Sequence, residues 1–73
     1  MLLLTKIFDI LNNYSNKDNL INKVRISPDN KRIVVDANFN KAITIRQENN
    51  KLIIEGDTDY CNRIKDIIEE AIR

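Results

Sequence analysis

The chain of 73 residues carries 12 basic and 11 acidic side chains, one cysteine, one glycine and no histidine. This length predicts one small domain over residues 1–73 that buries only about 60% of its unfolded surface. A lone cysteine excludes an internal disulfide, and without histidine we expect no structural zinc, no other metal and no cofactor. The formal charge of +1 gives no overall preference for nucleic acid or for an anionic membrane.

The composition also sets expectations for compartment and assembly. A single free cysteine is typical of a reducing compartment, so we expect a cytoplasmic protein. Lys6 and Asp9 interrupt the apolar run at residues 1–4 far short of a spanning segment, and we expect no membrane association. Because disulfides and metals are not expected, self-association, for example as a homodimer, is the remaining support for so small a domain.

Residues 2–14 repeat their apolar side chains every three to four positions, which predicts an amphipathic helix. One stripe consists of Leu4, Ile7, Phe8, Leu11 and Tyr14. Leu3 and Ile10 widen this stripe beyond the needs of one core contact. Surplus apolar side chains often mark an interface, so Leu3 and Ile10 are candidate partner-binding residues. The alternative is that the first turn of the helix wraps the core.

Residues 20–55 alternate apolar and polar side chains in steps of two, which predicts strands near 20–27, 31–39, 42–47 and 51–55. The alternation predicts one apolar face, made of Leu20, Val24, Ile26, Ile33, Val35, Ala37, Phe39, Ile43, Ile45, Leu52 and Ile54.

Three turns join these strands, around residues 28–30, 39–42 and 49–50. The first turn pairs Ile26 with Ile33 and Val24 with Val35, and the last turn pairs Ile45 with Ile54 and Gln47 with Leu52. The middle turn must have an odd length, and we expect it to bring Ala37 opposite Ile43.

Gly56 ends the last strand, and Asp57 or Thr58 caps a second helix over residues 58–73. Its predicted buried stripe is Tyr60, Cys61, Ile64, Ile67, Ile68, Ala71 and Ile72. Short hairpins favour an antiparallel meander, and both helices need an apolar surface to cover. The predicted fold class is therefore α+β, a two-layer sandwich of a four-stranded antiparallel meander with the N- and C-terminal helices on one face.

The uncovered face of this sheet is the first candidate for a function. It would carry Ile21, Lys23, Arg25, Arg32, Val34, Asp36, Asn38, Thr44, Arg46, Lys51, Ile53 and Glu55, with Arg25, Val34, Arg46 and Ile53 in one cross-strand row. Arginine beside exposed aliphatic side chains is typical of binding interfaces. The candidate partner-binding residues here are Arg25, Arg32, Val34, Arg46 and Ile53. The alternative is a solvated face whose charges pair across strands.

Nucleic-acid binding through Lys23, Arg25, Arg32 and Arg46 is a second hypothesis, because residues 20–56 hold seven basic and four acidic side chains. The predicted face has no aromatic side chain on which bases could stack, so this hypothesis is not favoured.

The segment Ile43-Thr44-Ile45-Arg46 to Lys51-Leu52-Ile53-Ile54-Glu55-Gly56-Asp57, followed by an apolar helix, resembles the strand–turn–strand–helix end of KH-type nucleic-acid domains. The Gly-x-x-Gly loop that clamps nucleic acid in that family is absent, since Gly56 is the only glycine, and no site is carried over.

The sequence offers few candidate catalytic residues. The run from Asp57 to Asp59 could hold magnesium, but helix capping explains it more simply. Cys61 could be a reactive thiol near a helix start, yet its place on the buried stripe suggests a small apolar residue. We therefore expect a non-catalytic protein-interaction module that binds a protein partner. Its size is typical of phage or mobile-element accessory proteins and inhibitors.

Overall fold

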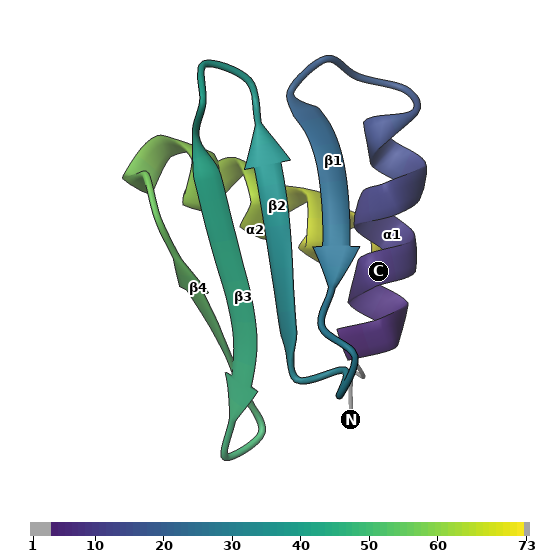
Figure 1. The fold of residues 1–73 in the computed structure, drawn as a ribbon, viewed down its shortest axis with the longest axis vertical. Coiled ribbons are helices and arrows are strands. Elements are labelled where there is room, and N and C mark those ends of the chain that lie inside the picture. Colours follow the sequence, from purple (N-terminus) through teal and green to yellow (C-terminus); the bar gives the residue numbers. More distant parts are fainter. Residues whose placement is uncertain (1–3, 73) are drawn as a thin grey trace.

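Two helices and four strands follow one another in the order α1–β1–β2–β3–β4–α2 (Figure 1). The computed structural model describes residues 4–72. The elements are α1 Leu4–Ser15, β1 Ile21–Ile26, β2 Arg32–Ala37, β3 Ala42–Glu48, β4 Lys51–Glu55 and α2 Thr58–Ile72. Leu3, a candidate interface residue, lies outside the described residues.

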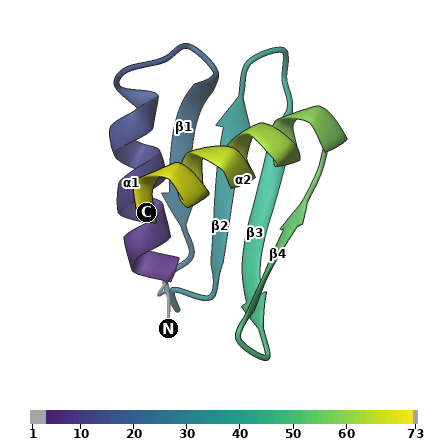
Figure 2. The same cartoon turned by 180° about the vertical axis from the view of Figure 1, so that it is seen from behind.

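The four strands form one antiparallel sheet in the order β1-β2-β3-β4, which is a meander. In both views α1 lies beside β1 while α2 crosses one face of the sheet, from the end of β4 toward α1 (Figures 1 and 2). Both helices therefore bury their apolar stripes against the same sheet. The expected α+β fold, with a helix at each end of the meander, is confirmed.

One hydrophobic core joins the helices to the inner face of the sheet. Its buried members are Leu4, Ile7, Leu11, Leu20, Ile21, Val24, Ile33, Val35, Ile43, Ile45, Ile64 and Ile68. Val35 and Ile45 are 0% exposed, whereas Val34 and Ile53 on the other face are half-buried. Because side chains alternate along a strand, this burial confirms the predicted division of the sheet into an inner and an open face.

The start of α2 is fixed by a capping residue and by the only glycine. Asp57 Oδ1 accepts hydrogen bonds from the backbone N–H groups of Asp59 (3.1 Å) and Tyr60 (3.3 Å). The N–H of Tyr60 and, to a smaller extent, the Lys41 ammonium 3.4 Å away hold the pKa of Asp57 below its ordinary value. Gly56 has a φ of 143°, and a Cβ atom there would lie 2.6 Å from Ile43 Cδ1.

The register between β2 and β3 differs from the prediction by two residues. Val35 pairs with Ile43, and Asp36 pairs with Ala42, so Ala37 does not face Ile43. The turn is shorter than expected because Phe39 and Asn40 both adopt a positive φ, at 58° and 59°. A shift of two residues keeps the faces but changes which side chains meet across strands.

Phe39 was predicted in the core, and that prediction is wrong. Its side chain is 83% exposed at the tip of the β2–β3 turn. A residue in the left-handed region interrupts the alternation of a strand, so the aromatic ring does not follow the inward side of β2.

Ile21 was predicted on the open face but is only 2% exposed. The ladder between β1 and β2 shifts between Ile21 and Lys23, and the extra residue Asn22 donates a side-chain hydrogen bond to the carbonyl oxygen of Ala37 at 3.2 Å. Such a bulge resets the alternation, which lets Ile21 and Val24 both face the core.

The last turn of α2 is also more open than predicted. Ala71 and Ile72 were expected in the buried stripe, but both are exposed, Ile72 to 49%. Only Ile64 and Ile68 are fully enclosed in α2, since the helix has a hollow on each side of its last turns. Within residues 4–72 no helix has the length and apolar character needed to cross a bilayer.

Candidate functional site

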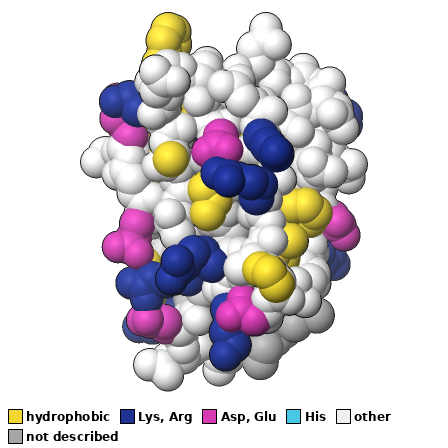
Figure 3. Space-filling view, viewed as in Figure 1, with side chains coloured by type: hydrophobic (Ala, Val, Ile, Leu, Met, Phe, Trp, Pro, Cys, Tyr) yellow, Lys and Arg dark blue, Asp and Glu magenta, His cyan; other side chains and the backbone are white. Residues whose placement is uncertain are grey.

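The open face is the surface of the sheet that α2 leaves uncovered, and Figure 3 views it directly. Basic side chains lie near its middle, with acidic and apolar side chains among them (Figure 3). Arg25 Nη2 lies 3.0 Å from Asp36 Oδ2. Arg46 Nε lies 3.0 Å from Glu55 Oε1, and Arg46 also pairs with Glu48. Two of the three candidate arginines are thus matched by carboxylates.

The observed register regroups the candidate residues on this face. Arg25 pairs with Val34 as predicted, but Val34 then pairs with Thr44 instead of Arg46. Arg46 faces Arg32 on one side and Ile53 on the other. The Arg32 guanidinium makes no ion pair with another described residue. The predicted row of Arg25, Val34, Arg46 and Ile53 is therefore divided between two neighbouring rows.

The charge pairing changes what the open face can attract. The hydrogen bond to Glu55 is the main reason that the pKa of Arg46 lies above its ordinary value. A guanidinium held by carboxylates has little attraction left for a phosphate, and exposed pairs of this kind are common on solvated sheets. All five candidates lie on the predicted face, but only Arg32 is a cation without a carboxylate partner among the described ion pairs.

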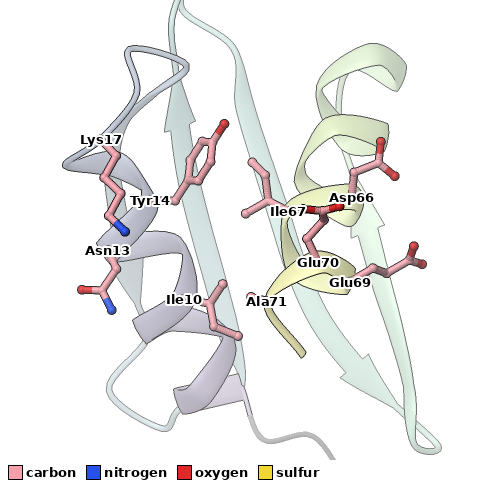
Figure 4. Close-up of a pocket in the computed structure, with 9 residues that line it drawn as sticks. All are labelled: Ile10, Asn13, Tyr14, Lys17, Asp66, Ile67, Glu69, Glu70 and Ala71. Atoms are coloured by element: carbon pink, nitrogen blue, oxygen red, sulfur yellow. The ribbon is translucent and has the colours of Figure 1, made fainter. Parts of the chain in front are cut away.

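A groove of about 670 Å³ runs between the two helices, and we call it the interhelical groove. Its apolar floor is Ile10, Tyr14, Ile67 and Ala71, and its polar rim is Asn13, Lys17, Asp66, Glu69 and Glu70 (Figure 4). Residues four apart share one face of a helix, which brings Ile10 and Tyr14 together on α1. The same spacing brings Ile67 and Ala71 together on α2.

The rim of the interhelical groove is acidic. Three carboxylates, those of Asp66, Glu69 and Glu70, come from α2, whereas Lys17 is the only cation among the lining residues. Figure 4 shows Lys17 on the α1 side and the carboxylates on the α2 side. Within residues 4–72 none of these three carboxylates takes part in an ion pair. The groove thus combines an apolar floor with a net negative rim.

Tyr14 is fixed at one end of this groove. Its hydroxyl donates a hydrogen bond to Asp18 Oδ2 at 3.0 Å, which raises the pKa of Tyr14. Asp18 Oδ1 accepts the backbone N–H of Leu20 at 3.0 Å, and this bond is the main reason that the pKa of Asp18 is lowered. The two bonds tie the aromatic ring to the loop that leads into β1.

A second hollow lies between α2 and β4, next to the outer edge of the sheet. Its apolar lining is Leu52, Ile54, Cys61, Ile68 and Ile72, with Asn62, Lys65 and Glu69 at its margin. Leu52 and Ile54 point to the inner side of the sheet but are only half-buried. Among the strands that the structure describes, β4 has β3 as its single neighbour. We call this outer side of residues 51–55 the β4 edge.

Cys61 is half-buried near the start of α2. Burial is the main cause that raises the pKa of the Cys61 thiol, with the Asp57 carboxylate adding to it, so the thiolate is disfavoured. In the described part of the chain, no three cysteine, aspartate or glutamate side chains gather closely enough to hold a metal ion. Asp57 acts as the helix cap that the sequence predicts.

The interhelical groove contains one of the predicted candidates and several residues that were not predicted. Ile10 lines it, as its surplus position on α1 indicated. The predicted core included Tyr14, Ile67 and Ala71. The sequence does not give the angle at which α2 crosses toward α1, so it could not show that these residues line a groove. The predicted meander already places the fourth strand at one edge of the sheet, but no site was predicted at that edge.

Comparisons of the chain with protein-family models, with curated proteins and with solved structures find no match. They give no support to the local resemblance between residues 43–73 and KH-type domains. The surfaces of this chain are therefore the basis for any proposal about its function.

Proposed function

We propose that this chain is a non-catalytic protein-interaction module whose interhelical groove binds a basic, apolar segment of a partner protein. One observation carries the proposal: the apolar floor of Ile10, Tyr14, Ile67 and Ala71 is flanked on the α2 side by three carboxylates that have no ion-pair partner among the described residues. A concave apolar surface with few convergent polar groups is typical of a binding site.

The physical basis of binding has two parts. An apolar side chain that enters the groove leaves water together with Ile10 and Ile67, and each Å² of apolar surface removed contributes about 25 cal/mol. Lysine or arginine beside that side chain would meet Glu70 first, while Asp66 and Glu69 point away from α1 and add negative charge further out on α2 (Figure 4). Charges at the rim mainly raise the association rate and select the partner, while the floor supplies affinity. A helix with one apolar stripe fits such a groove between two helices.

The chemistry of the groove favours binding over catalysis. Its titratable groups are carboxylates, one ammonium and one phenol, and the chain has no histidine to act as a general base. A module that captures one partner segment also suits a small phage or mobile-element accessory protein or inhibitor. We place its action in the cytoplasm, where the free Cys61 would stay reduced.

Selection from a peptide library displayed on phage tests this proposal. We expect enriched peptides to carry apolar residues three or four positions apart, flanked by lysine or arginine. Ile10→Asp should lower their affinity by about tenfold or more. The variant adds a carboxylate, which by itself would favour basic peptides, so a loss of affinity must come from the apolar floor. Circular dichroism would verify that each variant is folded.

A matched pair of charge reversals isolates the role of the rim. Glu70→Lys should weaken the selected peptides, whereas Asp9→Lys makes the same change on the exposed side of α1, outside the groove, and should leave binding intact. Acidic or uncharged selected peptides, or equal effects of the two reversals, would refute the proposal.

A further inference from the structure

We propose that the β4 edge pairs with the β4 edge of a second copy of this chain, in antiparallel fashion about a two-fold axis at Ile53. The two sheets would then form one continuous sheet with the helices of both copies on the same side. This inference concerns a surface separate from the interhelical groove and does not depend on it.

β4 is the edge of the sheet that has space for another strand. The opposite edge strand, β1, has α1 beside it in both ribbon views (Figures 1 and 2). No helix lies along the outer side of β4 in those views, since α2 leaves its end and crosses the inner face. Natural edge strands are commonly blunted by an internal charge or a proline, but Leu52, Ile53 and Ile54 form an uncharged centre.

The hairpin before β4 determines where its free hydrogen-bonding groups point. Asn49 and Asn50 both have a positive φ, 49° and 67°, and Glu48 pairs with Lys51 directly across this two-residue turn. In such a hairpin the closing pair exchanges hydrogen bonds and every second residue follows. Leu52 and Ile54 therefore direct their backbone N–H and C=O groups away from β3, toward the open edge.

The sequence of β4 is complementary to itself in this arrangement. With Ile53 on the axis, Lys51 faces the partner's Glu55 and Glu55 faces the partner's Lys51. Leu52 faces the partner's Ile54, and the outward backbone groups of these two residues would exchange hydrogen bonds. A two-fold interface requires that each such contact occurs twice, as it does here.

Other antiparallel registers lose this complementarity. If Leu52 lay on the axis, Lys51 would face the partner's Ile53 and no opposite charges would meet. If Ile54 lay on the axis, Glu55 would face the partner's Ile53. Lys51 would face the partner's Asp57, but that residue lies beyond the end of β4 and is already paired with Lys41. A shift by one residue would set inner-face side chains against open-face side chains, which a two-fold axis perpendicular to the sheet does not allow. The charges of Lys51 and Glu55 thus select one register.

Both faces of the joined sheet would gain contacts. On the open face, Glu55 already lies 3.0 Å from Arg46 Nε and would receive the partner's Lys51 on its other side. On the inner face, Leu52 and Ile54 are only half-buried, and Ile72 nearby is 49% exposed. The partner's Leu52 and Ile54 would extend this apolar layer. A small domain that buries little surface alone gains most from such support.

Sedimentation equilibrium of the wild type and three variants tests the pairing. We expect the wild type to be a dimer at micromolar to submillimolar concentration. Lys51→Glu and Glu55→Lys each place like charges opposite one another twice, so each variant alone should raise the dissociation constant by about tenfold or more. An equimolar mixture of the two variants restores both opposite-charge pairs and should dimerise again. Lys6→Glu, an equal charge change on α1, should leave the dimer unaffected.

Amide hydrogen exchange gives a second measurement on the wild type itself. The N–H groups of Leu52 and Ile54 should be protected at concentrations where the dimer forms and exchange readily on dilution. A wild type that stays monomeric over this concentration range would overturn the proposal. So would a dissociation constant that neither charge reversal changes, or an equimolar mixture of the two variants that stays monomeric. Protection of Leu52 and Ile54 that does not vary with concentration would also overturn it.

Discussion

The hydroxyl of Tyr60 in α2 donates a hydrogen bond to the amide oxygen of Asn38 at the start of the β2–β3 turn. The backbone N–H of Asn38 in turn donates to the carbonyl oxygen of Leu20 at 3.0 Å. Asn38 therefore links the last helix, the middle turn and the segment that enters β1. Three parts of the chain that are distant in sequence are held together at one end of the sheet.

The first prediction concerns this link. Tyr60→Phe keeps the ring but removes the hydroxyl, which leaves the Asn38 oxygen without its donor, and we expect the free energy of unfolding to fall by about 1 kcal/mol. Urea denaturation measures the change. An unaltered midpoint would show that water replaces the hydroxyl without loss. Adding Tyr60→Phe to Asn38→Ala should cost little beyond Asn38→Ala alone if the bond is real, since Asn38→Ala also removes the amide donor to the carbonyl oxygen of Asn19.

Phe39 provides a prediction of increased stability. The residue combines a φ of 58° with a side chain that is 83% exposed, so it carries backbone strain without core contacts. Asparagine tolerates the left-handed region, and we expect Phe39→Asn to raise the free energy of unfolding by about 1 kcal/mol. Phe39→Ala is the control, since it removes the ring but keeps the strain. Thermal denaturation measures the stability of both variants. If Phe39→Ala were as stable as Phe39→Asn, backbone strain at Phe39 would not be the cause.

Gly56 should tolerate no side chain. Its φ of 143° is rarely adopted by other residues, and an added Cβ would lie 2.8 Å from the carbonyl oxygen of Ala42. We expect Gly56→Ala to lower the free energy of unfolding by about 2–4 kcal/mol, because either the backbone or the neighbouring strand must move. Chemical denaturation gives the value. A loss below about 0.5 kcal/mol would mean that β4 and α2 can be joined by another backbone conformation.

The cap of α2 predicts a dependence of stability on pH. The pKa of Asp57 is lowered below its ordinary value of 3.8 in the folded state, chiefly by the N–H of Tyr60. Its contribution is therefore fully present above about pH 4 and is lost as the pH falls through the lower folded pKa. Asp57→Asn keeps a capping oxygen without the charge.

Urea denaturation at pH 7 and pH 3 measures this contribution. We expect the difference in stability between the two pH values to be smaller in Asp57→Asn than in the wild type. Some difference should remain, because Asp18 and Asp29 also have lowered pKa values. Equal pH dependence in the two proteins would contradict the role of Asp57.

The alternation of side chains predicted the two faces of the sheet and two of its three registers. It failed at Phe39, where turn conformation decided the side-chain direction, and at Ile21, where a bulge reset the pattern. Both failures depend on backbone dihedral angles that composition does not reveal. The helices could be predicted, but the interhelical groove could not, because it depends on how α2 crosses the sheet.

For the candidate site residues, too, the sequence predicts which face a side chain lies on more readily than which side chains it meets. Ile10 lines the interhelical groove, and its role in binding stays a prediction. Ile67 packs against the core as predicted and also lines the groove, whereas Ala71 is exposed. The open-face arginines were placed on the correct face, and the alternative that charges pair across strands there is what the structure shows for Arg25 and Arg46. Pairing across strands is a tertiary property, so charge counts over a segment overstate how basic a surface is.

Chemical-shift mapping of the ¹⁵N-labelled chain tests the proposed function most directly. The probes are two synthetic helical peptides with the same leucine stripe, one with lysine and one with glutamate on its polar face. We expect the lysine peptide to shift the amides of Ile10, Tyr14, Ile67 and Ala71 at concentrations where the glutamate peptide does not. Shifts centred on Arg32 and Arg46, or equal shifts with both peptides, would contradict this expectation.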